Sequence, residues 1–373
     1  NISVVVLKPT DKEIISKVKE TGFNIPIVFV DDKMNKKELT DKIDQLADKF
    51  EKSLIPPFLK GLIIHNENEV IHFATPGHHD GSFFAQHPSG KIFQNFIGPQ
   101  CFSNDRSSSD IDIGDLLIHQ GYPDLAEKHA AQVFHSDKAY FVVNGSDTCI
   151  LIICKALLAN DDLVLFDRNN HKSAYNGALV QSGATPIYLQ TERNPYGLIG
   201  GISGFCLKED FIRNKIKSIC PEKANEKRPF RLAIIQLGTY DGTVYNARQI
   251  IDKIGHLCDY VLFDSSWVGY EQFIPMLRNC SPLLLDLTEN DPGIIVVQSV
   301  ERQMAGFSQA SQILKKDFHI KDQQRYCNHQ IFNGAYRFYT STSPFYPLFA
   351  SLDVNARIHE GNTGIIMWEK TVV

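Results

Sequence analysis

Polar residues whose side chains could bind a ligand or take part in catalysis follow four runs of apolar residues that are predicted to be strands. They occupy positions 144–148, 167–173, 264–267 and 298–302. In the first, Asn144-Gly145 opens a predicted helix, whose free N–H groups suit a phosphate, although Ser146 could equally be an ordinary N-cap. Asp264 follows an all-apolar strand and could hold a cationic ring nitrogen or simply cap the strand end. His171 taken alone is more often a surface histidine.

The elements that must position these residues alternate between strand and helix. Strands are predicted at 139–143, 163–166, 186–189, 232–236, 260–263 and 293–298. Helices are predicted between them, at 147–159, 173–181, 208–219 and 247–254. This alternation predicts an α/β fold with a doubly wound, mainly parallel sheet, in which ligands bind at the carboxyl ends of the strands. The four polar segments follow strands, so we expect them to meet in one site.

The first 72 residues are predicted to form separate parts that precede the main strand–helix alternation. Residues 1–34 read as strand, helix and strand, with Gly22 ending the helix, which is one βαβ unit. An amphipathic helix at 36–54 follows, and Pro56-Pro57 then breaks the chain. We expect three parts: the end of a small parallel-sheet domain at 1–34, a linker region at 35–72 and the main domain at 73–373.

Composition excludes several classes of protein. Apolar residues make up 43% and charged residues 22% of 373 residues, as in globular proteins, and the net charge is −5. A mildly acidic chain without a basic block is a poor nucleic-acid binder, and no apolar run is long enough to span a membrane. The eight cysteines stand singly, without metal-ligand spacing, so we expect reduced thiols, no metal and a cytoplasmic location.

Together the four segments describe most of a pyridoxal-phosphate site on an aspartate-aminotransferase-like fold (fold type I). The chain also resembles the bacterial ornithine/lysine/arginine decarboxylases, pyridoxal-phosphate enzymes with an N-terminal, flavodoxin-like wing domain. On this resemblance, residues 1–34 are the end of the wing domain, and the family's C-terminal domain has no counterpart. The matching segments run in family order: 75–78 (Thr-Pro-Gly-His), 110–113, 167–173, 239–242, 263–267, 306–311 and 341–344 (Ser-Thr-Ser-Pro).

The resemblance fails at the cofactor anchor. The family's pyridoxal-binding lysine corresponds to Arg302, and the neighbouring histidine that contacts the phosphate corresponds to Glu301. A guanidinium is always protonated and cannot form the internal aldimine. The family's run of small hydroxyl residues in the phosphate cup reads Ser146, Asp147, Thr148 here. A carboxylate about 5 Å from one phosphate charge costs roughly 3 kcal/mol at an effective dielectric near 20, so we expect no bound pyridoxal phosphate.

Other family-like positions are kept, namely His171, Asp264, Trp267 and Ser299. Their retention can be structural, and Trp267 is more often core than contact. Without a cofactor, Asp147, Asp264 and Glu301 would repel one another. We therefore expect Arg302 to bond at least one of these carboxylates inside the pocket.

Three functions follow as hypotheses. The first is a catalytically inactive homologue, a structural or regulatory protein that keeps the family's homodimer or a larger homo-oligomer, with an active decarboxylase or another protein as a candidate partner. The second is a working pyridoxal-phosphate decarboxylase of ornithine, lysine or arginine, which would need another lysine, with Lys172 the nearest by motif. The third is a binding protein that uses the pocket for an anion at Arg302 or a polyamine at the carboxylates.

Overall fold

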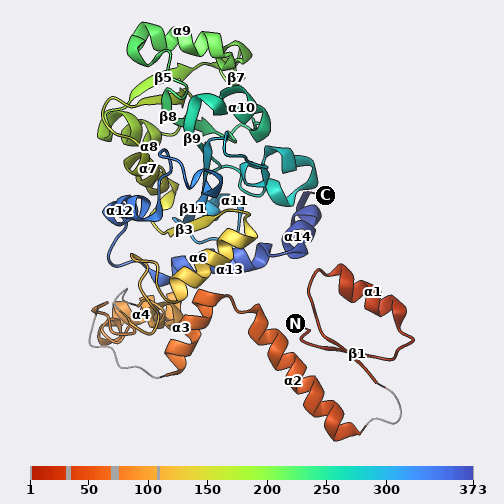
Figure 1. Ribbon diagram of the computed structural model, residues 1–373. Coiled ribbons are helices and arrows are strands. Elements are labelled where there is room, and N and C mark those ends of the chain that lie inside the picture. The colour runs from red at the N-terminus through yellow and green to blue at the C-terminus, as the bar shows by residue number, and fades with distance from the viewer. Residues whose placement is uncertain (1, 31–34, 69–74, 107–109, 373) are drawn as a thin grey trace.

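Seven strands form the central sheet of the computed structural model, which describes residues 2–30, 35–68, 75–106 and 110–372. The strand order is β3-β11-β10-β9-β8-β4-β5 (Figure 1). All neighbours pair in parallel except β11, which runs antiparallel to both β10 and β3. The strands are β3 (Lys138–Val142), β4 (Leu163–Asp167), β5 (Thr185–Leu189), β8 (Phe230–Gln236), β9 (Cys258–Asp264), β10 (Gly293–Gln298) and β11 (Ser311–Lys316).

Helices cover both faces of this sheet, which is why the central strands are buried on both sides rather than alternating in polarity. One face packs against α3 (Pro57–Glu67), α6 (Tyr122–Val133), α9 (Glu209–Ile219), α10 (Ala247–Ile254) and α13 (Tyr346–His359). The other packs against α7 (Gly145–Leu157), α8 (Lys172–Ala174) and α12 (His329–Tyr339). The predicted α/β fold, with helices on both faces of a mainly parallel sheet, is therefore confirmed.

The structure also differs from the predicted elements in places. The helix predicted at 147–159 begins at Gly145, and the one predicted at 173–181 is α8 followed by a π-helix over Tyr175–Gln181. Strand β11 and the β6 (Thr191–Arg193) and β7 (Ile199–Ile202) hairpin were not predicted. Strand β11 contains the polar residues Gln312 and Lys315, which are buried, so it does not form an apolar run in the sequence. The buried Lys315 ammonium donates to the Cys327 carbonyl at 2.7 Å and lies 3.0 Å from Asp317.

The N-terminal part holds the predicted strand–helix–strand unit. Strands β1 (Val5–Leu7) and β2 (Ile27–Phe29) pair in parallel, with α1 (Lys12–Glu20) between them, and α2 (Lys36–Leu54) leads to the main domain. The expected boundaries after residues 34 and 72 fall at segments 31–34 and 69–74, which lie outside the described residues. None of the helices in the described parts is both long and apolar enough to cross a bilayer.

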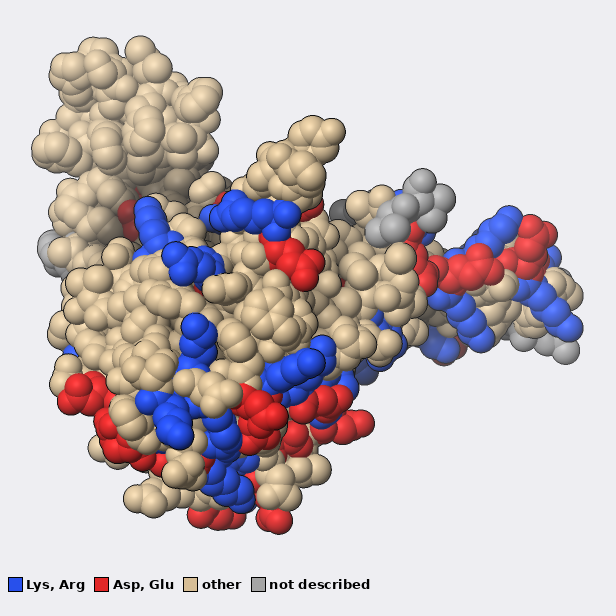
Figure 2. All heavy atoms as spheres, turned by 90° about the horizontal axis from the view of Figure 1, so that it is seen from above, with Lys and Arg blue, Asp and Glu red and all other residues tan. Residues whose placement is uncertain are grey.

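Two helices, α4 (Pro88–Ile97) and α5 (Pro99–Ser103), project from the main domain. The remaining α-helices of the described residues are α11 (Val300–Gln303) and α14 (Asn362–Val372). The projection at the left of Figure 2, where Figure 1 places α4, is mostly uncharged on its visible face. Several of its large apolar side chains are exposed: Phe83, Ile92, Phe93, Phe96 and Ile97.

Candidate functional site

A pocket of about 170 Å³ lies at the carboxyl ends of β4, β8 and β9, against the first turns of α7 and α11. This is the edge where a doubly wound sheet binds ligands. Six of the nine predicted site residues line it: Ser146, Asp147, His171, Asp264, Trp267 and Arg302. The remaining lining residues are Ile150, Asn169, Asn170, Gln236, Thr239, Tyr240 and Ser266.

Asp264 forms the floor of this pocket and is 2% exposed. Its Oδ1 accepts hydrogen bonds from the Ser266 backbone N–H at 3.0 Å and the Ser266 hydroxyl at 2.5 Å. Burial raises the pKa of Asp264, and the Ser266 hydrogen bonds and the charges of His171 and Arg302 oppose that rise. The carboxylate is thus fixed in orientation, and within the described residues every hydrogen bond it accepts goes to one oxygen.

Asp147 lies at the rim of the pocket, in the first turn of α7, where the helix dipole stabilises a carboxylate. Its Oδ1 is 3.1 Å from His171 Nδ1, and both side chains are about half exposed. The preceding Gly145 has a φ of 86°, and its N–H donates to the Gln309 carbonyl at 2.9 Å. The glycine-turn amide therefore already has a partner, and a carboxylate stands beside the position where a phosphate was expected.

Arg302 closes the other side of the rim. Its guanidinium lies over the Trp267 ring at 4.7 Å from the centroid, and its Nε is 3.7 Å from Glu301 Oε1. The expected ion pair thus forms with its sequence neighbour, while Asp147 pairs with His171 and Asp264 with Ser266. Arg302 was expected to bond at least one of the three carboxylates, and it does so at Glu301, while Asp147 and Asp264 have other partners.

Three predicted site residues are not part of the lining. The Thr148 hydroxyl donates to the Asn144 carbonyl at 2.9 Å, as side chains in a first helical turn often do. Ser299 is buried and donates to Glu301 Oε1 at 3.1 Å. Glu301 does not line the pocket but lies 3.7 Å from Arg302, which does.

Sequence reasoning missed Gln236 and Asn170 as site residues. Gln236 ends strand β8, and its amide donates to the carbonyls of Gly238 and Asp264. Asn170 follows β4 and donates to the carbonyls of Asp167 and Ile234. Asn170 lies within the polar segment 167–173 but was not singled out there, and Gln236 ends the strand predicted at 232–236, to which the strand-end rule was not applied.

The residues of this pocket do not fit a covalently held pyridoxal phosphate. Covalent attachment needs a lysine amine, and none of the described lining residues is a lysine. Lys172, the alternative anchor, is exposed and does not line the pocket. Asp264 could hold a pyridine nitrogen, but the carboxylate of Asp147 opposes a phosphate at the helix start.

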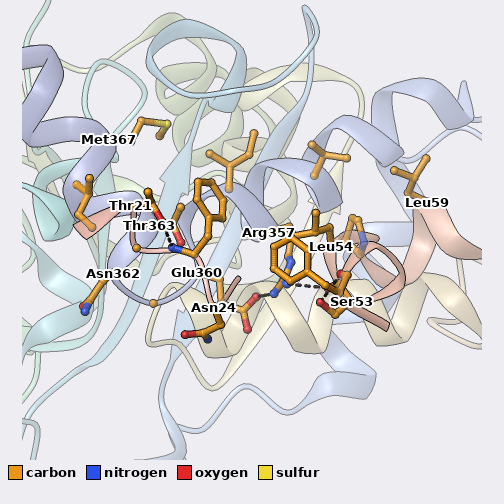
Figure 3. Close-up of a pocket in the computed structure, with 18 of the residues that line it drawn as sticks. Thr21, Asn24, Ser53, Leu54, Leu59, Arg357, Glu360, Asn362, Thr363 and Met367 are labelled. Atoms are coloured by element: carbon orange, nitrogen blue, oxygen red, sulfur yellow. Dashed lines mark hydrogen bonds and ion pairs between the residues drawn. The ribbon is translucent and has the colours of Figure 1, made fainter. Parts of the chain in front are cut away.

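A wider cavity lies far from this chemistry. It has a volume of about 890 Å³ and is enclosed by the turn after α1, the end of α2, and α13 and α14 (Figure 3). Its lining includes the apolar side chains of Leu54, Leu59 and Met367 and an ion pair between Arg357 and Glu360. Its size alone does not make it a reactive site, because it lacks the strand-end polar groups found in the smaller pocket.

Residues 56–373 match the family model described as the major domain of Orn/Lys/Arg decarboxylases. The chain belongs to this family. It is 51% identical over 393 aligned residues to the ornithine decarboxylase of Haemophilus influenzae, and 57% identical over 332 to the inducible ornithine decarboxylase of Escherichia coli. These alignments cover 100% and 89% of this chain but only 55% and 45% of the relatives, so the chain spans about half of their length.

The solved structures agree with this assignment. Lysine decarboxylase A from Pseudomonas aeruginosa superposes with a TM-score of 0.89 at 28% identity, covering 99% of this chain and 53% of that one. The lysine decarboxylase of Francisella novicida gives a TM-score of 0.88 at 28% identity, with the same coverage. Both cover the N-terminal unit as well as the main sheet, since almost the whole chain is included.

Proposed function

We propose that this chain is an ornithine-decarboxylase-type protein whose pocket does not decarboxylate through a lysine-bound pyridoxal phosphate. The observation that carries the proposal is the lining of the strand-end pocket. It contains two carboxylates, a histidine and an arginine, and no lysine among its described residues. On this proposal, Arg302 stands at the family's lysine position and Glu301 at its histidine position.

The chemical reason is that the pocket lining offers no primary amine to which pyridoxal phosphate could attach. Attachment of a pyridoxal aldehyde needs a neutral primary amine, and the Arg302 guanidinium is permanently protonated and delocalised. Arg302 is also engaged with Trp267 and Glu301, so its side chain covers the rim instead of reaching the floor at Asp264. His171 is in turn engaged with Asp147.

An active ornithine decarboxylase is the second candidate, and the relatives favour it. Four relatives at 48–57% identity carry the name ornithine decarboxylase. That name is a direct reason to expect the same activity, whereas inactivity has no support outside the pocket itself. An active protein would have to recruit a lysine from outside the described lining.

Release of carbon dioxide from carboxyl-labelled ornithine, with pyridoxal phosphate supplied, separates the two candidates. The ornithine decarboxylase of Haemophilus influenzae is the positive control. We expect no release above the rate of the protein-free control. Release proportional to protein concentration would support the second candidate and refute the first, provided that it is absent from an Asp264→Asn variant.

We further propose that the protein forms a homodimer or larger homo-oligomer, with residues 1–34 as the end of a wing domain and 35–72 as a linker. The α4 projection supports association, because Phe96 is 86% and Ile92 71% exposed, more than a monomer usually leaves in water as a cluster. Light scattering should give at least twice the chain mass of 42.1 kDa at micromolar concentration. The charged substitutions Ile92→Asp and Phe96→Asp should reduce it to the monomer mass.

A further inference from the structure

A buried histidine, His119, anchors the loop formed by residues 113–121 and does not line the strand-end pocket. The loop closes on itself, because the N–H groups of Asp115 and Gln120 each donate to the carbonyl of the other, at 3.1 and 3.0 Å. The side chain of His119 is only 2% exposed, and its φ of 53° lies in the left-handed region. A non-glycine residue keeps this conformation only where its surroundings hold it firmly.

Both ring nitrogens of His119 face oxygen atoms. Nδ1 is 2.6 Å from Glu127 Oε2 on α6, and Nε2 is 2.9 Å from Asn333 Oδ1 on α12. The orientation of the Asn333 amide follows from its other contact, in which Nδ2 donates to the Leu117 carbonyl at 3.1 Å. Since a carbonyl can only accept, the amide oxygen must point at the ring. Each ring nitrogen therefore needs a proton, and the arrangement fits an imidazolium.

The Glu127 carboxylate is held in place by the sheet. Its Oε1 accepts from the Phe141 N–H on β3 at 2.9 Å, and the residue is 3% exposed. Burial alone would lower the pKa of His119, but the charge of Glu127 and the hydrogen bonds of Glu127 and Asn333 outweigh it and raise this pKa above its ordinary value. Ring and carboxylate thus form a buried ion pair, in which each charge depends on the other.

The titratable groups that face the ring are Glu127 on α6, Lys138 and Tyr140 on β3, and His329 and Tyr336 on α12. The like charge of Lys138 opposes protonation of His119. Burial lowers the pKa of His329 to about 4 and raises the pKa of Tyr140 and of Tyr336. These three groups therefore keep one charge state between pH 6 and pH 9, whereas the ring can lose a proton.

We infer that His119, Glu127 and Asn333 form a proton-dependent latch. While the ring carries both protons, it ties the 113–121 loop to α6 and to α12 (Figure 1). When the pH rises and one proton passes to water, the carboxylate retains the proton on Nδ1. Nε2 then becomes an acceptor that faces the Asn333 oxygen, so this contact turns repulsive and the loop is released from α12. The latch does not involve the cofactor pocket, so its failure would leave the proposed function untouched.

Nitrogen-15 NMR of protein labelled in its histidines tests the charge of the ring. The signals of His119 are those that disappear in His119→Gln. We expect both ring nitrogens to be protonated in most molecules at pH 6.5, where an ordinary histidine is about half protonated. A ring that is mainly neutral at pH 6.5 would overturn the inference.

Hydrogen exchange of the wild-type protein, followed by mass spectrometry, tests the release of the loop. The contribution of His119 to stability is full below about pH 6.5 and is lost as the pH rises through its folded-state pKa. After correction for the intrinsic exchange rate, protection of the 113–121 amides should fall by up to about tenfold per pH unit in this window and then level off. Protection of α10, which takes no part in the latch, should stay constant. Equal protection of the loop from pH 6 to pH 9 would refute the latch.

Two variants separate the latch from a merely structural role, which would change protection equally at every pH. Glu127→Gln provides an amide that can donate to a neutral ring, so the pH dependence of loop protection should disappear. Asn333→Asp adds a second carboxylate, which should move the fall in protection upward by about one pH unit or more. His256→Gln, in an exposed pair with Glu209, is the matched control and should leave the profile unchanged. An unchanged profile in Glu127→Gln would refute the inference, even if Asn333→Asp fails to fold.

Discussion

The floor and the rim of the strand-end pocket carry the same kinds of polar group in very different surroundings. At the floor, Asp264 and Gln236 end neighbouring parallel strands and are 2% and 6% exposed. At the rim, the side chains of Asp147, His171 and Arg302 are 47%, 40% and 31% exposed. The floor is thus part of the protein core, whereas the rim is solvated, and substitutions in the two regions should differ in cost and in kind.

The largest difference should appear in packing. Phe263 precedes Asp264 on β9 and is fully buried, so Phe263→Ala should lower the free energy of unfolding by about 3–5 kcal/mol. Trp267 at the rim is 39% exposed, so Trp267→Ala should cost less than half as much. Urea unfolding of the two variants measures both values. Equal costs would contradict the division into a core-like floor and a solvated rim.

A buried carboxylate at the same sheet edge should make stability depend on pH. Burial raises the pKa of Asp167 to about 6, against about 3.9 in the unfolded chain, although backbone N–H groups of Asn169 and Gln236 oppose the rise. Between these values the native state binds more protons than the unfolded state, so this group's contribution to stability falls as the pH rises from ~4 to ~6.

Asp167→Asn should remove the fall in stability that ionisation of the buried Asp167 causes as the pH rises. Relative to the wild type, the variant should gain stability between pH 4 and pH 8, by up to about 3 kcal/mol, because one pKa unit corresponds to 1.36 kcal/mol. Urea unfolding at both pH values measures the gain, and the exposed Asp252→Asn serves as the matched control. A variant whose stability relative to the wild type is the same at both pH values would show that this sheet edge holds the Asp167 charge without a cost in stability.

The smallest effect on stability is expected at Arg302. Its ion pair with Glu301 spans 3.7 Å and is partly solvated, and its contact with Trp267 is at the surface. Such contacts contribute about 0–1 kcal/mol each. Arg302→Gln should therefore shift the free energy of unfolding by no more than about 1–2 kcal/mol, and a thermal or urea unfolding curve checks this. A loss above 3 kcal/mol would mean that Arg302 is a buried structural ion.

The fold and the place of the site could be predicted from the sequence because both follow from local patterns. Apolar runs such as 232–236 and 293–298 mark buried parallel strands, and polar segments after them converge at one edge. Six of the nine predicted residues accordingly line one pocket.

The partners of each side chain could not be predicted in the same way. Arg302 was expected to bond at least one of three carboxylates, but the sequence did not indicate that the partner would be the neighbouring Glu301 or that the guanidinium would lie on the face of Trp267. Contacts between neighbouring residues need little chain ordering, whereas convergence of three carboxylates depends on rotamers that sequence patterns do not encode. The burial of Gln312 and Lys315 in β11 is likewise a tertiary effect.

Arg302 also offers a graded test of the pocket. The variant Arg302→Lys restores an amine but keeps Asp147 beside the expected phosphate position, so it should bind pyridoxal phosphate weakly or not at all. The triple variant Arg302→Lys, Glu301→His, Asp147→Ser removes both carboxylates and should bind it better. Visible absorption after addition of pyridoxal phosphate compares them. Full binding by the single variant would show that Asp147 and Glu301 do not matter.

Borohydride reduction of the wild-type protein after incubation with pyridoxal phosphate, followed by mass spectrometry of its peptides, tests the central claim most directly. Reduction fixes a pyridoxyl group on any lysine that forms an aldimine. The account predicts no stoichiometric pyridoxyl peptide in the wild type and a labelled peptide containing position 302 in the triple variant. A stoichiometric adduct on Lys172, or on any other lysine of the wild type, would contradict it.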